Sequence, residues 1–419
     1  MDNQNQIKRS FWKGTVTGFC MAVVLTVLGI SVYILTSERV RLDLNAAERF
    51  SSAQDVADSS SVQKKMKKIA QLIDKQYFEE IDPEEIETYI YKGMLAGTGD
   101  LYSGYYSKEE LKQFMEDASG SYSGIGVTMQ YDSTMQMVKI VGVNEKGPAA
   151  KVDIKEGDYI YKVDGKEIPL ENADTTKLVS KIRGEEGTKV ELTLLRGDDR
   201  KEIKVEVERK SLEVETVTGQ MLESQIGYIK ISQFEGVTAD QFEEKFEELK
   251  KAGAQGLILD LRGNPGGQVD IVCEIAGKFL PEGLVTYMED KYGNRQEYPC
   301  DGEDIWGKPL TVLVDGNSAS ASEILAGAVH DDKVGTLLGT KTFGKGIVQQ
   351  TINLGDGTAV KITFAKYYTP NGENIHGKGI EPDIEVAYEE LKDGEEYQIE
   401  KDNQILAAIA NIKEQMESR

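Results

Sequence analysis

The chain has 419 residues, which is too long for one compact core and suits two or three domains with appendages. Its formal net charge of −23 argues against a nucleic-acid-binding protein, which needs a basic surface to displace the counterions of phosphates. With 3 cysteines, 2 histidines and no Cys/His cluster, the sequence offers no zinc site, and we expect neither a metal nor a cofactor.

The first element is an apolar run from Gly14 to Thr36 without a charged residue. At about 1.5 Å per residue it is long enough to cross a hydrocarbon core of about 30 Å. Lys8, Arg9 and Lys13 precede it, so the positive-inside tendency predicts a cytoplasmic segment 1–13 and an extracytoplasmic remainder. A cleaved signal peptide is the alternative, but its apolar region is shorter and ends in a small-x-small site. We therefore expect a single-pass anchor in the cell membrane over 14–36.

Residues 37–117 are expected to form a stalk and a helical arm. The stalk is polar, and apolar residues then recur at helical spacing, with helices expected over 63–78, 83–96 and 107–117.

From Gly124 the pattern changes to short strands around one or two helices. Segment 118–210 resembles a PDZ domain (α+β), and the resemblance rests on the positions that follow the PDZ pattern: Gly147, Pro148, Ala149, Ala150, Ile154, Gly157, Asp158, Ile160, Val163 and Gly165.

A PDZ domain binds an extended peptide by strand addition and holds its C-terminal carboxylate with backbone N–H groups. The candidate loop is Ser123, Gly124, Ile125 and Gly126, whose glycines permit close backbone approach. An ordinary glycine-rich turn that opens a strand is the alternative. We expect Arg183, in a nearby turn, to be a solvated surface residue rather than a link between the peptide and the rest of the chain.

Residues 211–388 alternate strands with helices, and the strands are expected near 226–232, 256–263, 310–314, 335–339 and 348–367. Continuous apolar strands between helices indicate an α/β layer covered on both faces. Ligands of such sheets lie beyond the carboxyl ends of the strands.

Two polar segments follow these strand ends. Arg262-Gly263-Asn264-Pro265-Gly266-Gly267 is a glycine-rich turn before a helix, which suits the binding of an oxyanion by backbone N–H groups. Ser318, Ser320 and Ser322 alternate at the start of the next helix. A capping box of Ser320 and Glu323 explains part of this pattern, but three serines exceed what capping needs.

A nucleophilic serine requires a base. His330 follows Ser320 on the same expected helix, roughly 15 Å along its axis, and cannot reach the serine. Only His376, in a loop-like segment, is left, so lysine is the available substitute.

Four segments, GLILDLRGNPGG (256–267), SASASEILAGAVHD (318–331), GTKTFGKGIVQQ (339–350) and GKGIEPDIEV (377–386), resemble the signatures of the S41 C-terminal processing, or tail-specific, serine proteases. With the PDZ module the resemblance covers about 63–388. It implies a crotonase/ClpP-like α/β protease core and a serine endopeptidase that cleaves proteins near their C-termini.

The resemblance also implies a role for individual residues. Ser320 would be the nucleophile, Lys345 the general base and Gln349 the group that orients the lysine. The oxyanion hole would consist of the amides of Gly266 or Gly267 and of Ala321. The chain departs from the family at Gly99–Ser103, where many relatives have Leu-Asp-Pro, and at His330, and neither departure falls on a proposed catalytic position.

A lysine base must be neutral, so the pKa of Lys345 must fall below its usual value of about 10.4. Burial lowers a lysine pKa because it disfavours the cation. We expect Phe343, Ile347 and Val348 to provide the apolar surroundings.

A different class of function remains open, namely a catalytically inactive, membrane-tethered PDZ adaptor. A trypsin-like protease is excluded because no histidine precedes the serine. The expected partners are protein or peptide substrates bound through C-terminal tails. The C-terminal segment 389–419 has Ile405, Ile409 and Ile412 at helical spacing, and it is expected either to pack on the core or to pair subunits in a homodimer.

Overall fold

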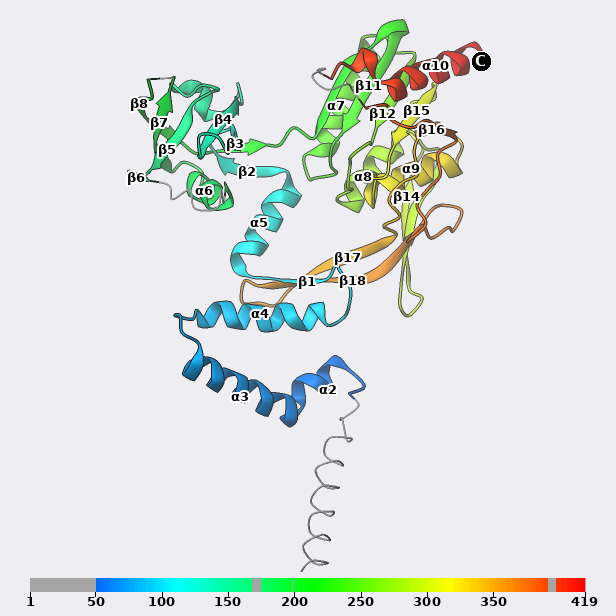
Figure 1. Ribbon diagram of the computed structural model, residues 1–419. Coiled ribbons are helices and arrows are strands. Elements are labelled where there is room, and N and C mark those ends of the chain that lie inside the picture. Colours follow the sequence, from blue (N-terminus) through cyan, green and yellow to red (C-terminus); the bar gives the residue numbers. More distant parts are fainter. Residues whose placement is uncertain (1–49, 168–174, 198, 391–396, 419) are drawn as a thin grey trace, which may run out of the picture. The chain divides into compact units, whose positions relative to one another are not determined.

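The computed structural model describes residues 50–167, 175–197, 199–390 and 397–418 (Figure 1). The expected cytoplasmic segment and membrane anchor, 1–13 and 14–36, lie outside these residues. In the part that is described, no helix combines the length and the apolar character needed to cross a bilayer. The chain divides into two compact units, 1–83 and 84–419, which are described separately.

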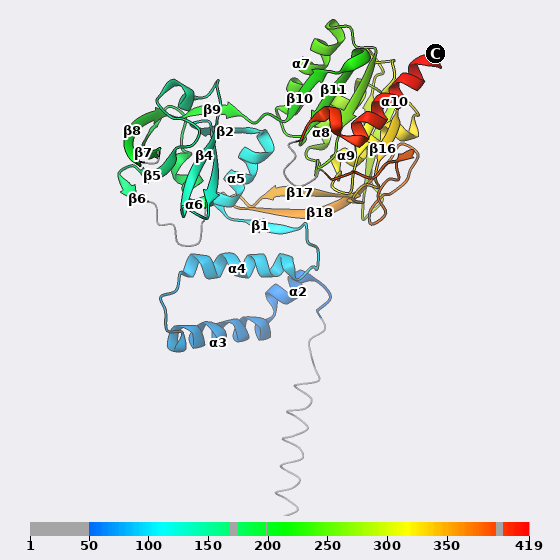
Figure 2. The same ribbon diagram turned by 45° about the horizontal axis from the view of Figure 1, so that its top comes forward.

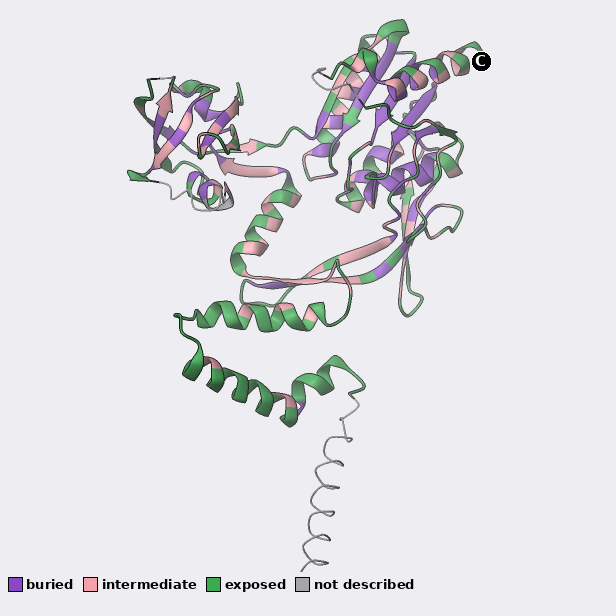
Figure 3. Ribbon diagram, in the orientation of Figure 1, coloured by how far each residue is buried: buried purple, intermediate pink, exposed green. Residues whose placement is uncertain are grey.

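The described residues of the first unit form helices α2 (Ala53–Asp58) and α3 (Ser60–Gln76). Helix α2 begins with a capping box of Ser52 and Asp55, and α3 is capped by Ser59. Their side chains are almost all exposed, as the green colour in Figure 3 shows.

The second unit begins one residue into helix α4 (Pro83–Ala96), which is followed by strand β1 (Gly104–Tyr106) and helix α5 (Lys108–Ser119). Helix α5 starts at a capping box of Ser107 and Glu110 and stops at Gly120, which has the left-handed conformation. The helices expected over 83–96 and 107–117 therefore form where the sequence predicts them.

The PDZ segment is a small antiparallel sheet with its own core. The strand order is β3-β4-β5-β7-β8, so β3 is an edge strand, and β6 pairs with β5. Helix α6 places Leu178 and Ile182 against Ile140, Ile160 and Leu192 of the sheet. The elements are β2 (Ser121–Gly124), β3 (Val127–Asp132), β4 (Met137–Val143), η1 (Pro148–Lys151), β5 (Tyr159–Val163), β6 (Lys166–Glu167), α6 (Thr175–Ile182), β7 (Lys189–Arg196), β8 (Lys201–Glu208) and β9 (Lys210–Glu213).

The central sheet of the remaining chain has the order β10-β11-β12-β15-β16-β19. Strand β10 pairs antiparallel with β11, and the pairs from β11 to β19 are parallel, as expected for an α/β layer. The strands are β10 (Val217–Met221), β11 (Ile226–Ile231), β12 (Gly256–Asp260), β15 (Leu310–Val314), β16 (Thr336–Gly339) and β19 (Ile384–Glu385).

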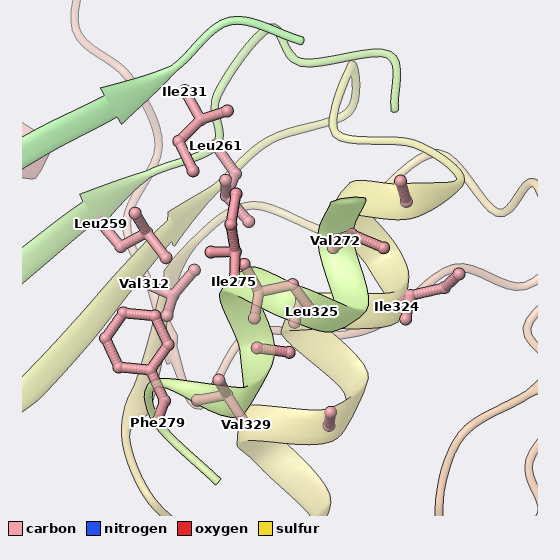
Figure 4. Close-up of a cluster of buried hydrophobic side chains, with 14 of the residues drawn as sticks. Ile231, Leu259, Leu261, Val272, Ile275, Phe279, Val312, Ile324, Leu325 and Val329 are labelled. Carbon is pink, nitrogen blue, oxygen red and sulfur yellow. The ribbon is translucent and has the colours of Figure 1, made fainter. Parts of the chain in front are cut away.

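Helices cover both faces of this sheet, and the strand side chains alternate between them. Leu259 packs with helices α7 (Thr238–Lys251), α8 (Val269–Gly277) and α9 (Ala321–Asp331), a cluster shown in Figure 4. Its neighbour Ile258 packs on the other face against α10 (Asn403–Glu417). The fold class expected for this segment, an α/β layer covered on both faces, is therefore confirmed.

Helix α10 shows how the apolar residues of the C-terminal segment are buried. Ile405, Ile409 and Ile412 are at most 8% exposed and pack on the sheet. The sequence leaves open whether this apolar face packs on the core or pairs subunits, and in the structure it packs on the core.

A second, antiparallel sheet joins β1 to the C-terminal half of the unit, in the order β1-β18-β13-β14 with β17 on β18 (Figures 1 and 2). The strands are β13 (Gly283–Asp290), β14 (Arg295–Cys300), β17 (Ile347–Asn353) and β18 (Ala359–Tyr368). The β17–β18 hairpin occupies the expected 348–367 region, whereas the β13–β14 hairpin was not expected from the sequence.

Candidate active site

The glycine-rich turn after β12 is fixed by its own backbone geometry. Gly266 and Gly267 have φ values of +106° and +147°, which disfavour any residue with a side chain. A Cβ on Gly266 would lie 2.7 Å from the Cβ of Ser320, and a Cβ on Gly267 would lie 2.1 Å from the Phe234 carbonyl oxygen. Gly266 is therefore required for the turn to approach the serine segment, and Gly267 for its approach to the backbone of Phe234.

The three alternating serines have different roles. The Ser318 hydroxyl donates to the Leu261 carbonyl at 2.8 Å and the Ser322 hydroxyl donates to the Asn264 carbonyl at 3.0 Å. Both side chains are fully buried and bind the serine segment to the glycine-rich turn. Ser320, between them, is half-buried and lines a cleft.

The backbone of Ser320 is strained. Its φ of +56° and ψ of −113° are unusual for a residue with a side chain, and it stands at the turn from strand β15 to helix α9. Such strain persists only where neighbouring contacts fix it, and it is typical of a serine presented as a nucleophile.

Glu323 is the residue that joins the serine segment to the lysine segment. Its carboxylate is fully buried and accepts hydrogen bonds from the backbone N–H groups of Ser320 at 2.9 Å, Gly344 at 2.7 Å and Lys345 at 2.9 Å. It also accepts from the Thr342 hydroxyl at 2.6 Å. The sequence predicts a capping box of Ser320 and Glu323, and the bond from the Ser320 N–H is only one of the four that Glu323 accepts.

Tyr367 of β18 makes a second connection that the sequence did not reveal. Its buried hydroxyl lies within hydrogen-bonding distance of the carbonyl oxygens of both Ser320 and Lys345. Burial and the nearby Glu323 carboxylate raise the pKa of Tyr367 well above its usual value, so the phenol stays protonated and able to donate.

A cleft of about 480 Å³ brings the candidate residues together: Ser320, Lys345, Gln349 and Gly267 all line it. Neither histidine lines this cleft. His330 is about half exposed and lies beside Asp331 and Asp383, and His376 is exposed. Lys345 is therefore a possible base where no histidine is available.

The surroundings of Lys345 lower its pKa. Burial is the main cause, the positive charge of Lys361 adds to it, and the carboxylates of Glu323 and Asp100 oppose it. Ile347 and Val348 line the cleft with the lysine, as the sequence predicts. Phe343 does not contribute, because its side chain turns outward and is 57% exposed.

The side chain of Lys345 does not contact the Ser320 side chain through a hydrogen bond in the described structure. Its Nζ atom lies instead 4.7 Å from the centre of the Tyr102 ring. The segment Gly99–Ser103, which departs from the family pattern, thus contacts the proposed base, although none of its residues is a proposed catalytic position.

Gln349 also has a partner other than the lysine. Its Nε2 donates to the Thr363 hydroxyl at 3.1 Å. Its role in orienting Lys345 stays a prediction.

The backbone amides expected to form the oxyanion hole differ in their availability. The Gly266 N–H donates to the Asn264 side chain at 2.8 Å and is thereby occupied. The Gly267 and Ala321 N–H groups have no hydrogen-bond partner among the described residues. Of the two glycines, Gly267 is therefore the better placed to bind an oxyanion.

A second groove, of about 290 Å³, lies between edge strand β3 and helix α6. Gly124, Ile125 and Gly126 line it, whereas Ser123 does not. The Ser123 hydroxyl is buried and has no hydrogen-bond partner among the residues that the structure describes. An unpaired strand edge beside a helix is the geometry that accepts an extended peptide.

Arg183 lies at this groove and is not the solvated surface residue expected from the sequence. Its guanidinium stacks over the Tyr122 ring at 4.6 Å, and its Nη1 lies 3.6 Å from the Glu116 carboxylate of α5.

Among the described residues, no group of three or more histidine, cysteine and acidic side chains is arranged to hold a metal ion. Cys273 and Cys300 are free thiols.

A strained serine at a strand-to-helix turn, next to a glycine-rich turn on an α/β sheet, defines the class of serine hydrolases. The family model for peptidase family S41 matches residues 225–386, and the PDZ domain model matches 122–207.

Curated relatives match most of the chain. It is 37% identical over 323 residues to the carboxy-terminal processing protease CtpA of Bacillus subtilis, covering 77% of this chain and 68% of CtpA. It is 34% identical over 339 residues to CtpB of the same organism, covering 80% and 70%. A solved structure of a photosystem II D1 C-terminal processing protease is 29% identical, with a TM-score of 0.46, and the match covers 76% of this chain and 86% of that one. The chain therefore belongs to peptidase family S41 and is a C-terminal processing serine protease with a PDZ domain.

Proposed function

We propose that this protease cleaves protein substrates with a Ser320–Lys345 dyad. The observation that carries the proposal is the cleft in which a strained serine and a half-buried lysine with a lowered pKa lie together without a histidine. The rest of the site provides the groups that such chemistry requires.

In the proposed mechanism, the neutral amine of Lys345 accepts the hydroxyl proton as Ser320 Oγ attacks the scissile carbonyl carbon. The carbonyl oxygen gains the negative charge, which the Gly267 and Ala321 amides stabilise. Lys345 then gives its proton to the leaving amine as the acyl-enzyme forms. Water hydrolyses the acyl-enzyme by the same steps, with Lys345 again as the base. Gln349 keeps the lysine side chain directed toward the serine.

The proposal predicts that Ser320→Ala and Lys345→Ala each abolish cleavage of fluorescein-labelled casein and leave the circular dichroism spectrum unchanged. Activity of the unmodified enzyme should rise with pH, because only neutral Lys345 is a base, and the midpoint should lie below the usual lysine pKa. Full cleavage by either variant would refute the dyad.

We infer that the PDZ groove captures the C-terminal tails of substrates and so controls cleavage. The support is the edge strand β3, the glycine-rich segment Gly124–Gly126 and the apolar lining from Ile125, Val179 and Ile182. A peptide with a free C-terminal carboxylate should bind more tightly than its C-terminal amide in a fluorescence polarisation assay. Equal affinity of the two peptides would contradict this mode of binding.

We further infer that residues 14–36 anchor the enzyme in the cell membrane with the protease outside the cytoplasm. The support is the uncharged apolar run and the basic residues before it. Protease added to intact protoplasts should digest the enzyme down to a small membrane-embedded fragment, and complete protection would contradict this orientation.

The inactive adaptor remains the alternative from another class. The presence of Ser320 and Lys345 in one cleft favours the enzyme. An adaptor would not react with a serine-directed phosphonate.

A further inference from the structure

The turn before strand β1 carries an aromatic ring to the proposed general base. Tyr102 belongs to the segment 97–103 between α4 and β1, distant in sequence from every motif that identifies the active site. The Lys345 ammonium nitrogen lies over the Tyr102 ring, 4.7 Å from the ring centre. This distance is within the range of a cation–π interaction, which favours the protonated form of the lysine.

Polar contacts of the surrounding turn fix the position of Tyr102. The Tyr102 N–H donates to Asp100 at 3.0 Å, and the Ser103 hydroxyl donates to the same carboxylate. The Thr363 N–H of β18 donates to the Ser103 hydroxyl at 3.0 Å. The next strand, β1, then pairs with β18 from Gly104 onward.

The same contacts reach Gln349. Thr363, whose N–H binds Ser103, accepts a hydrogen bond from Gln349 through its own hydroxyl. The turn and the residue proposed to orient the lysine are therefore attached to a single residue of β18, with Lys345 in the cleft that Gln349 also lines.

The charged and titratable groups around Lys345 come from several elements. Asp100 lies on the turn, Glu323 on α9, and Lys361 and Tyr367 on β18, while acidic residues of other elements line the same cleft. These cleft residues are Asp117 of α5, Glu235 before α7 and Asp270 of α8. Lys361 is itself held over aromatic rings, those of Tyr106 at 5.5 Å and Phe114 at 5.6 Å. Among the described residues, the Tyr102 ring is thus the one aromatic face over which the Lys345 ammonium lies.

We propose that Tyr102 is a positioning residue for the general base: its ring face holds protonated Lys345 in a resting place away from the Ser320 hydroxyl. To act, the lysine loses its proton to solvent and leaves the ring for the serine. The turn 97–103 thereby sets the fraction of enzyme molecules in which Lys345 is neutral and free to reach Ser320 at a given pH. The proposal rests on the Ser320–Lys345 dyad proposed above.

Replacing the Tyr102 ring should change the pKa of Lys345 in a predictable direction. The ring stabilises the ammonium, so Tyr102→Leu should lower the pKa of Lys345 and move the acid limb of kcat/KM to lower pH. The expected shift is about half to one pH unit, from the strength of cation–π interactions. Activity on the acid limb should therefore rise by about three- to tenfold at a fixed pH.

The experiment measures kcat/KM for fluorescein-labelled casein against pH, with the full chain in detergent micelles. Tyr102→Phe keeps the ring face and should keep the acid limb of the unmodified enzyme. Tyr292→Leu is the matched control, because it removes an exposed ring under Lys291, outside the cleft, and should not move the limb. A limb that stays in place in folded Tyr102→Leu, or that moves equally in Tyr102→Phe, would overturn the proposal.

A shape-preserving substitution covers the case in which Tyr102→Leu does not fold. Pentafluorophenylalanine at position 102 retains the size of the ring and removes the negative potential of its face, so it should move the limb in the same direction as leucine. An unmoved limb in this variant also overturns the proposal.

Lys345→Ala separates this proposal from the proposed function. If Lys345→Ala is inactive and folded Tyr102→Leu leaves the limb in place, the dyad stands and the role of Tyr102 is wrong. If Lys345→Ala cleaves casein normally, the dyad is wrong, and the role of Tyr102 is wrong with it.

Discussion

At the scale of single residues, the buried carboxylate of Glu323 connects the proposed nucleophile to the proposed base. Its four donors come from Ser320 on one side and from Thr342, Gly344 and Lys345 on the other. A carboxylate suits this position because it only accepts hydrogen bonds, and all its neighbours donate. Together with Tyr367, this side chain therefore sets the separation of the serine and lysine segments.

Glu323→Gln should lower kcat/KM by about 10²-fold, the effect expected when catalytic groups are displaced by about 1 Å. Glutamine has an amide nitrogen in place of one carboxylate oxygen. This nitrogen donates hydrogen bonds and cannot accept them from the backbone N–H groups that it would face. The acid limb should also move to lower pH, because the lost negative charge favoured the Lys345 ammonium.

The matched control is Glu381→Gln, which removes an exposed carboxylate paired with Lys341. Its kcat/KM and pH profile should equal those of the unmodified enzyme. Equal profiles for the Glu323 and Glu381 variants would contradict the connecting role of Glu323.

Sequence reasoning found some of these residues and missed others for a physical reason. Ser320, Lys345 and Gln349 stand in local motifs, and the structure places them in one cleft. Tyr102 and Tyr367 reach the site from segments without a recognisable spacing, so only the three-dimensional fold shows their contacts. Glu323 was visible, but its position three residues after Ser320 fits a helix cap equally well.

At the scale of elements, helix α10 is attached to the sheet next to the glycine-rich turn. Asp402, its N-cap, binds Arg262 at 2.9 Å, and Arg262 also binds Asp260 at 2.6 Å. Both carboxylates are at most 3% exposed. The residue that opens the turn therefore also holds the C-terminal helix.

Arg262→Met should reduce the free energy of unfolding by about 3–5 kcal/mol, because it leaves two buried carboxylates without their cation. Lys413→Met, on the same helix, removes an exposed pair with Glu223 and should cost less than about 1 kcal/mol. Urea unfolding followed by circular dichroism measures both. Equal losses of unfolding free energy in the two variants would show that the buried ion pairs of Arg262 stabilise the fold no more than the exposed pair does.

Elements with continuous apolar sequences were the ones predicted well. Strands β12 and β15 are buried at every position, and their apolar runs identify them without any other information. The β13–β14 hairpin escaped prediction because β14 is mostly exposed and contains Pro299. Its partner β18 lies far along the chain, so no local pattern reports their pairing.

At the scale of the whole molecule, the PDZ core and the core of the α/β layer were predictable because the apolar residues of each segment follow their own pattern along the sequence. The PDZ cluster and the clusters on the two faces of the central sheet contain separate sets of residues. The contact between segment 97–103 and Lys345 joins distant parts of the sequence, and the sequence alone does not report it.

The most direct test of the central claim is the mass-spectrometric identification of the residue that a fluorescent peptidyl phosphonate labels between pH 7 and 10. The dyad predicts one adduct, on Ser320, that forms faster as the pH rises. The adduct should be absent in Ser320→Ala and severely reduced in Lys345→Ala. An adduct on Ser318 or Ser322, or undiminished labelling of Lys345→Ala, would contradict the account.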